Sequence, residues 1–156
     1  MKQQVFCYGT LAIPHVMAAL TGGDFRTISA HVTHYARFLL KDKPYPGMCR
    51  RDGVVTSGLL YLNVDAQSLR VIDGFEDDIY VREVIEVLPK SGVLTNAWAY
   101  IVSDKYTKWL GVECWDPIFF WTNMVNPISK CVRKCELNFF TASIEKYPDE
   151  FKCSIS

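Results

Sequence analysis

The segment IDGFEDDIYVR, residues 72–82, holds the densest group of carboxylates in the chain. Its four acidic residues fall within six positions, with two aromatic residues beside them: Asp73, Phe75, Glu76, Asp77, Asp78 and Tyr80. The simpler interpretation is a solvated turn between a helix and a strand. The alternative is that the aromatic rings exclude water from one carboxylate, whose pKa then rises toward neutrality and suits a general base. Glu76 is the candidate for that role, because it follows Phe75 and directly precedes the next predicted strand.

A second segment that could do chemistry is VFCYGTL, residues 5–11. An apolar run breaks at Gly9, and Thr10 follows. One interpretation is a strand that ends in an ordinary turn. The other is a loop whose backbone N–H groups hold a ligand, since glycine permits unusual dihedrals and close approach. Such amides can bind a carboxylate or a developing oxyanion.

Composition excludes several classes of protein. The 156 residues are 49% apolar and 13% aromatic, which suits one domain with a sizeable core. Lysine plus arginine and aspartate plus glutamate both number 17, and this balance argues against a nucleic-acid partner. No apolar stretch reaches the roughly 20 residues of a membrane helix, and no signal-peptide core follows the start. We therefore expect a cytoplasmic protein that has no membrane partner.

The cysteines and histidines do not form a metal-binding pattern. The six cysteines include no C-x-x-C pair, and the three histidines do not lie at ligand spacing to them. We expect reduced, structural cysteines and no metal, rather than disulfides or a zinc site. A thiol hydrolase built on Cys7 and His15 is a further alternative. Strand alternation, however, places Cys7 and Tyr8 on opposite faces, and no orienting third residue is evident.

The elements that must position these residues can be predicted from periodicity and end signals. Strands are expected over 3–8, 31–40, 54–63, 80–89 and 96–103, with a loop over 41–53. Helices are expected from Pro14 to the glycines at 22–23, from Asp65 to Gly74, after Asp116, and over 128–139. The order is not a regular βαβ alternation. It predicts an α+β fold, a small mixed β-barrel with flanking helices and a helical C-terminus.

Four motifs in order carry a resemblance to a known family. They are Tyr8-Gly9-Thr10-Leu11, Tyr45-Pro46, Ile72-Asp73-Gly74-Phe75-Glu76 and Tyr80-Val81-Arg82. Together they resemble the gamma-glutamylcyclotransferase-like superfamily, above all the branch of plant avirulence-induced proteins and their bacterial relatives. The resemblance covers roughly residues 4–102.

The resemblance implies a specific reaction. Active members cut a γ-glutamyl amide by attack of the substrate's own α-amine, which releases 5-oxoproline. It implies that Glu76 is catalytic and that the loop binds substrate through Tyr8, Gly9, Thr10 and Leu11. Tyr80 and Tyr100 are expected either to line the pocket or to fill the core. The implied partner is a small γ-glutamyl molecule, and no cofactor or metal is needed.

Further expectations concern function and organisation. A non-catalytic module that binds a γ-glutamyl-like molecule is the alternative function, because folds outlive their chemistry. We expect a single domain over 1–156, with a core at 4–102 and a helical C-terminal cover at 103–156. Those C-terminal helices are also candidates for a homodimer interface or a lid.

Arg82 is expected to brace Asp73. Many relatives carry a glycine soon after the Tyr-Gly-Thr-Leu loop. Here the segment that follows the loop contains Pro14 instead, and it departs from the family pattern.

Overall fold

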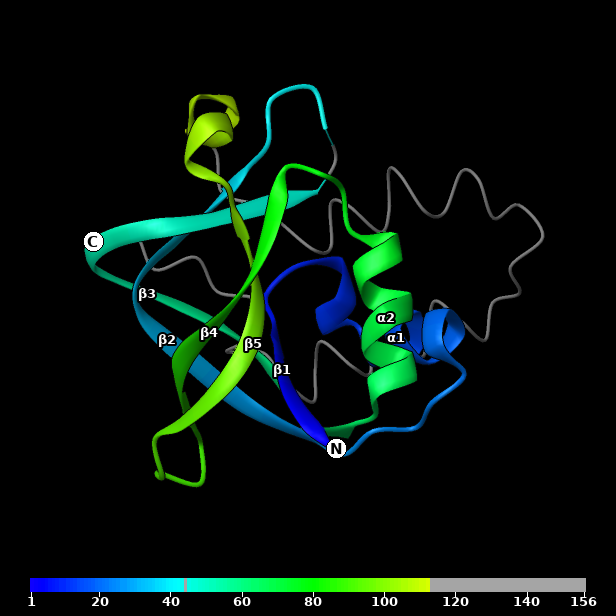
Figure 1. Cartoon of the computed structure of the whole chain (residues 1–156). Helices are drawn as coiled ribbons and strands as arrows, with labels where there is room; N and C mark the ends of the chain where they lie inside the picture. The colour runs from blue at the N-terminus through cyan, green and yellow to red at the C-terminus, as the bar shows by residue number, and fades with distance from the viewer. Residues whose placement is uncertain (44, 113–156) are drawn as a thin grey trace, which may run out of the picture.

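The computed structural model describes residues 1–43 and 45–112 of the chain. Their core is a closed five-stranded barrel with strand order β1-β3-β2-β4-β5 (Figure 1). The strands are β1 (Gln3–Cys7), β2 (Thr27–Leu39), β3 (Pro46–Val64), β4 (Tyr80–Pro89) and β5 (Thr95–Val102). All neighbours pair antiparallel except β1 and β5, which close the barrel in parallel at Val5 and Trp98. The predicted mixed barrel is therefore confirmed.

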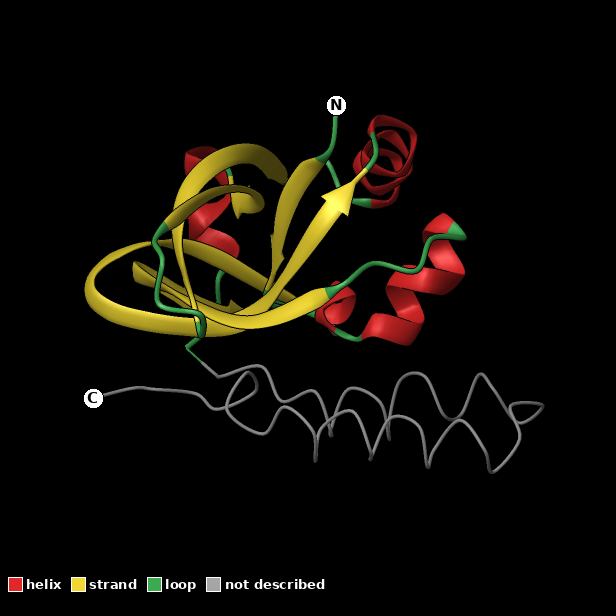
Figure 2. Ribbon diagram, turned by 90° about the horizontal axis from the view of Figure 1, so that it is seen from below, coloured by secondary structure: helices red, strands yellow, loops and turns green. Residues whose placement is uncertain are grey.

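Two helices pack together outside the barrel wall, as Figures 1 and 2 show. They are α1 (Pro14–Thr21) and α2 (Ala66–Phe75), and short 3-10 turns follow β1 and β5 as η1 (Thr10–Ala12) and η2 (Asp104–Trp109). The predicted starts of both helices and the glycine end of α1 are confirmed, whereas the predicted end at Gly74 is wrong, because α2 continues through Gly74 to Phe75 and Glu76 is its C-cap. Pro14 begins α1, Gly22 ends it in the left-handed region with φ 70°, and the Asp65 side chain caps α2 by accepting from the Ser68 amide at 2.8 Å. No helix among these residues is long and apolar enough to cross a membrane.

The prediction of a loop over 41–53 is wrong for most of its length. Strand β3 begins at Pro46 and pairs with β2 along almost the whole length of that strand, from Leu39 opposite Pro46 to Thr27 opposite Tyr61. Gly47, one of the residues that predicted a loop, has another role here. A Cβ on Gly47 would lie 2.4 Å from a methyl carbon of Val102, so this glycine permits close packing rather than a turn. Strand β2 likewise begins earlier than predicted, at Thr27.

Apolar residues form two layers on either side of the barrel wall. Alternation along β1 places Phe6 and Tyr8 in the cluster inside the barrel, whereas Val5 and Cys7 join the cluster beneath α1 and α2. The outer cluster includes Met17 of α1 and Ile72 of α2. The expected opposition of Cys7 and Tyr8 is confirmed. The end of β1 therefore lies between the packed interior and the helical layer, and the functional site forms there.

Candidate active site

A pocket opens where the end of β1 meets the end of α2. It contains roughly 430 Å³ of empty space, part of it open to solvent. Its lining includes every residue that the sequence nominated: Tyr8, Gly9, Thr10, Leu11, Glu76, Tyr80 and Tyr100. It also includes Cys7, which was considered only in the thiol alternative, and four residues that were not proposed to contact substrate: Phe6, Tyr45, Pro46 and Phe75. Barrel closure thus brings together the two segments that were singled out for chemistry.

Glu76 combines burial with a perturbed pKa. It terminates α2, where its backbone N–H donates to the Ile72 carbonyl at 3.0 Å and its own backbone turns extended. Burial raises the pKa of Glu76 to about 7, and the negative charge of Asp77 adds to the rise. Glu76 interacts electrostatically with titratable groups on several elements. They are Cys7 and Tyr8 at the end of β1, Tyr80 on β4, Tyr100 on β5, and the adjacent Asp77. A carboxyl with such a pKa can both accept and return a proton near neutral pH.

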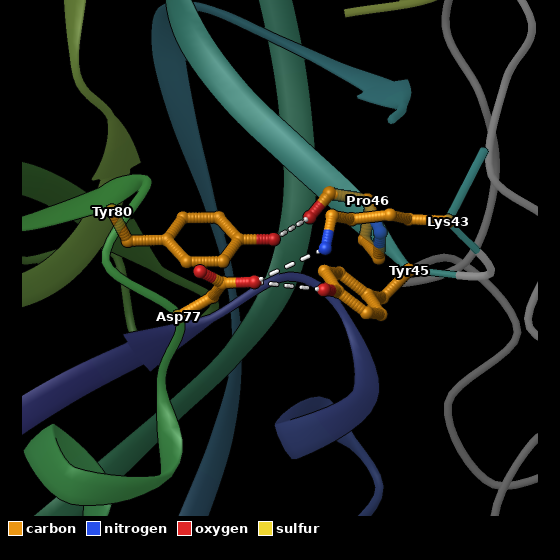
Figure 3. A network of polar contacts seen from close by, with 5 residues as sticks. All are labelled: Lys43, Tyr45, Pro46, Asp77 and Tyr80. Carbon is orange, nitrogen blue, oxygen red and sulfur yellow. Dashed lines mark hydrogen bonds and ion pairs between the residues drawn. The ribbon is translucent and has the colours of Figure 1, made fainter. Parts of the chain in front are cut away.

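Asp77 is held in a polar network rather than free in solvent, as Figure 3 shows. Its Oδ2 accepts hydrogen bonds from the Lys43 ammonium at 3.2 Å and from the Tyr45 hydroxyl at 3.0 Å. The Asp77 side chain is 37% exposed. Burial acts to raise the pKa of Asp77, whereas the hydrogen bonds from Tyr45 and Lys43 act to lower it. The net result is a pKa below its usual range. The network ties the β2–β3 turn to the loop that carries Glu76.

Tyr80 and Tyr100 line the pocket with their hydroxyl hydrogens already donated. Tyr80 donates to the Pro46 carbonyl at 2.5 Å, and Tyr100 donates to Oδ1 of Asp73 at 2.7 Å. Burial raises the pKa of both phenols, so both are neutral. Their remaining capacity is to accept a hydrogen bond. Both earlier expectations therefore hold in part, because the hydroxyls are satisfied by protein groups and still lie at the pocket.

Asp73 connects this wall of the pocket to the outer face of the barrel. Its Oδ2 accepts from Nη1 of Arg82 at 2.8 Å, which confirms the expected brace. The Arg82 guanidinium also lies over the Trp98 ring, 4.7 Å from its centroid. Asp73 is thus paired on both oxygens, and it fixes the Tyr100 hydroxyl.

The Tyr8 phenol at the start of the Tyr8–Leu11 loop is engaged by other protein groups. The Tyr8 hydroxyl donates to the Tyr100 carbonyl at 2.6 Å and accepts from the Met48 amide at 3.2 Å, so the ring ties β1 to β5 and β3. The carbonyls of Gly9 and Thr10 accept from amides three residues on, which closes the η1 turn. The N–H groups that begin such a turn have no acceptor within it.

Gly9 is required by the packing of this loop. A Cβ at Gly9 would lie 2.8 Å from Cγ of Pro46 at the start of β3. The Tyr-Pro motif and the Tyr-Gly-Thr-Leu motif therefore touch, although they are far apart in the sequence.

Sequence reasoning missed one polar residue beside this loop. Arg37 of β2 is 6% exposed, and its Nη1 donates to the Tyr8 carbonyl at 2.6 Å. Burial lowers the pKa of Arg37 to about 10, so it stays cationic at neutral pH. A signal was present, because Arg37 is the one charged residue in the apolar and aromatic run YARFLL.

The thiol alternative gains no support from the geometry. Cys7 is buried, and burial together with the charge of Glu76 raises the pKa of its thiol well above the usual value, which opposes a reactive thiolate. His15 lies exposed on α1. Within residues 1–43 and 45–112, no three histidine, cysteine, aspartate or glutamate side chains converge to hold a metal ion. Cys7 and Cys49 are free thiols, and the other four cysteines lie outside the described residues.

Several predictions fall on the part of the chain that is not described. The helices expected after Asp116 and over 128–139, and with them the proposed interface or lid, lie outside the described residues. Of the expected C-terminal cover, only its first residues are described, and they contain η2.

Comparisons with known proteins agree with this fold. A family model described as "Gamma-glutamyl cyclotransferase, AIG2-like" matches residues 5–117. AIG2-like protein D of Arabidopsis thaliana is 33% identical over 84 residues, which cover 54% of this chain and 55% of that protein. The chain therefore matches only about half the length of this curated relative.

Two solved structures share the fold. A solution structure of an Arabidopsis thaliana protein superposes with a TM-score of 0.67 at 24% identity, over 99% of this chain and 93% of that chain. A structure described as a gamma-glutamyl cyclotransferase superposes with a TM-score of 0.57 at 12% identity, over 66% of this chain and 68% of that one.

Proposed function

The chain belongs to the AIG2-like gamma-glutamyl cyclotransferase family, and from this premise we propose that it releases 5-oxoproline from a γ-glutamyl amide. The observation that carries the proposal is the placement of Glu76, a half-buried carboxyl with a pKa of about 7, in one pocket with the Tyr8–Leu11 loop. A carboxyl of this kind serves a reaction that needs one proton removed and one proton delivered.

In the proposed reaction, Glu76 takes a proton from the substrate's α-ammonium group. The freed amine attacks the γ-carbonyl carbon, and a bond from the α-nitrogen to that carbon closes a five-membered ring. The amide bond to the leaving nitrogen then breaks and Glu76 returns the proton to that nitrogen. The ring nitrogen gives up its second proton to the departing amine, which leaves as an ammonium group. The products are 5-oxoproline and an amine, and no water, metal or cofactor is consumed. Because the attack is intramolecular, a pocket that holds the chain curled supplies much of the rate.

The polar groups of the pocket divide into acceptors and donors that suit this substrate. The Tyr80 and Tyr100 oxygens and the Glu76 carboxylate are acceptors, which match the N–H groups of an α-ammonium. The backbone N–H groups of Gly9, Thr10 and Leu11 are the donors proposed to hold the α-carboxylate or the oxyanion of the γ-carbonyl. Phe75 and Tyr45 add apolar surface to the lining.

The test is release of 5-oxoproline by the purified protein. A panel of γ-glutamyl amino acids, γ-glutamyl amines and glutathione would be incubated with the wild type and with Glu76→Gln. Glu86→Gln is the matched control, because Glu86 is an exposed glutamate on β4. We expect release by the wild type and the control, and a loss of at least about 100-fold in Glu76→Gln. Release that survives in Glu76→Gln would exclude Glu76 as the base.

No release from any compound would instead favour a binding module. In that case a γ-glutamyl compound that raises the Tm of the wild type without being consumed would identify the ligand class.

A further inference from the structure

A buried cation lies directly behind the substrate loop. Arg37 enters the barrel interior from β2, opposite Met48 in the strand register, and its Nη1 lies 2.6 Å from the Tyr8 carbonyl oxygen. A second, longer contact joins Nη1 to the Ser57 carbonyl at 3.5 Å. A bond of 2.6 Å from a guanidinium is charge-assisted, and such bonds are roughly twice as strong as neutral ones. The Tyr8 carbonyl is therefore held pointing into the barrel.

The direction of that carbonyl determines the direction of the next amide. The described residues contain no cis peptide bond, so the Tyr8–Gly9 peptide is trans. In a planar trans peptide the N–H points opposite to the C=O. The N–H of Gly9 therefore points away from Arg37 and the barrel interior, toward the outer side of the wall. The pocket extends to that side, because its lining includes Gly9 together with Phe75 and Glu76 from the end of the outer helix α2, while Phe6 and Tyr8 line it from the inner cluster.

The same bond changes the strength of the amide as a donor. A cation at the carbonyl oxygen draws electron density through the peptide, and hydrogen-bonded groups in series polarise one another. We propose that Arg37 is a positioning residue that orients and polarises the Tyr8–Gly9 peptide, so that the Gly9 N–H donates to the substrate's γ-carbonyl oxygen as negative charge develops there. The inference rests on the proposed cyclotransferase reaction and adds a source for its oxyanion stabilisation.

A purely structural role would give a different pattern. A buried arginine is a poor means of filling an apolar barrel, and replacement of buried ionic groups by apolar residues is often neutral or stabilising. If Arg37 only filled space, Arg37→Met would change stability and leave the Gly9 amide and the turnover as they are. If Arg37 acts through the peptide, Arg37→Met changes both the Gly9 amide and the turnover. Arg37→Lys keeps a cation and therefore restores part of the lost turnover.

The experiment compares the wild type, Arg37→Lys, Arg37→Met and a control, Arg51→Met. Arg51 is an exposed arginine on β3 that lies over the Phe38 ring and does not line the pocket. Two readouts are taken on the full chain. The first is kcat and KM for 5-oxoproline release from the substrate identified in the panel. The second is the ¹H–¹⁵N resonance of the Gly9 amide, with and without added 5-oxoproline as the probe.

We expect Arg37→Met to lower kcat about 10- to 100-fold with little change in KM, because oxyanion contacts act on the transition state. The Gly9 resonance should shift in Arg37→Met, shift less in Arg37→Lys, and stay in place in Arg51→Met. In the wild type, 5-oxoproline should shift the Gly9 resonance.

Three results would overturn the inference. They are a Gly9 resonance that 5-oxoproline leaves unmoved in the wild type, a resonance unaffected by both Arg37 substitutions, and a kcat that both substitutions leave within twofold. If Arg37→Met does not fold, Arg37→Lys decides alone, by the same criteria. If the wild type releases no 5-oxoproline, the proposed function fails, and the Gly9 resonance still decides whether Arg37 positions this peptide toward a ligand.

Discussion

Replacement of Glu76 by glutamine should make the protein more stable at neutral and alkaline pH. The folded state holds the Glu76 proton more tightly than the unfolded chain, because burial and the charge of Asp77 raise its pKa to about 7 from 4.5. Stability is therefore lost as the pH rises from about 4.5 to about 7, and the loss persists above that range. Glutamine has nearly the same shape and cannot ionise, so the variant does not undergo this loss.

The size of the effect follows from the pKa. Since one pKa unit corresponds to about 1.4 kcal/mol, the difference between 4.5 and about 7 gives an upper limit of about 3.5 kcal/mol. Glu76 keeps some contact with water at the pocket, and solvent screening reduces that limit. We expect Glu76→Gln to gain between about 1 and 3 kcal/mol on the wild type between pH 4 and pH 8.

Urea denaturation at pH 4 and pH 8, with reductant present, measures this difference directly. The quantity of interest is the change with pH in the stability difference between the variant and the wild type, which cancels the titration of all other groups. Glu86→Gln on the exposed face of β4 makes the same chemical change outside the pocket and serves as the control. A Glu76→Gln difference that is equal at both pH values, or equal to that of the control, would refute the reasoning.

Three further predictions follow from the site. Asp77→Asn removes the negative charge beside Glu76 and leaves the Lys43 ammonium, so the rise of kcat/KM with pH should move to lower pH; a move to higher pH would contradict the assigned cause. Gly9→Ala places a methyl group 2.8 Å from Cγ of Pro46. It should lower the free energy of unfolding by about 1 to 3 kcal/mol and the turnover at least tenfold. A Cβ at Gly74 has nothing within 4 Å, so the control variant Gly74→Ala should fold and react normally. Cys7→Ala should keep turnover within a few fold in the same release assay, since the raised pKa of this thiol opposes a nucleophilic role, and a 100-fold loss would revive it.

Much of the fold could be predicted because it depends on local signals. Pro14 and Asp65 mark helix starts through groups within one turn of each, and period-two patterns mark β4 and β5. The start of β3 could not be predicted in this way. Its proline and glycine signals are typical of loops, and only pairing with β2 across the barrel makes residues 46–53 a strand.

The sequence by itself determined which residue types stand at the ends of β1 and α2, and its ordered motifs were enough to indicate the family. The tertiary structure decided what each of those groups can do. It turned the Tyr8 phenol inward onto the Tyr100 carbonyl, 92 residues away, and placed Arg37 behind the loop, 29 residues from Tyr8. It also tied Asp77 to Lys43, 34 residues before it. The physical reason is that caps and periodicity act between near neighbours, whereas burial, pKa and hydrogen-bond direction depend on groups that meet only when the barrel closes.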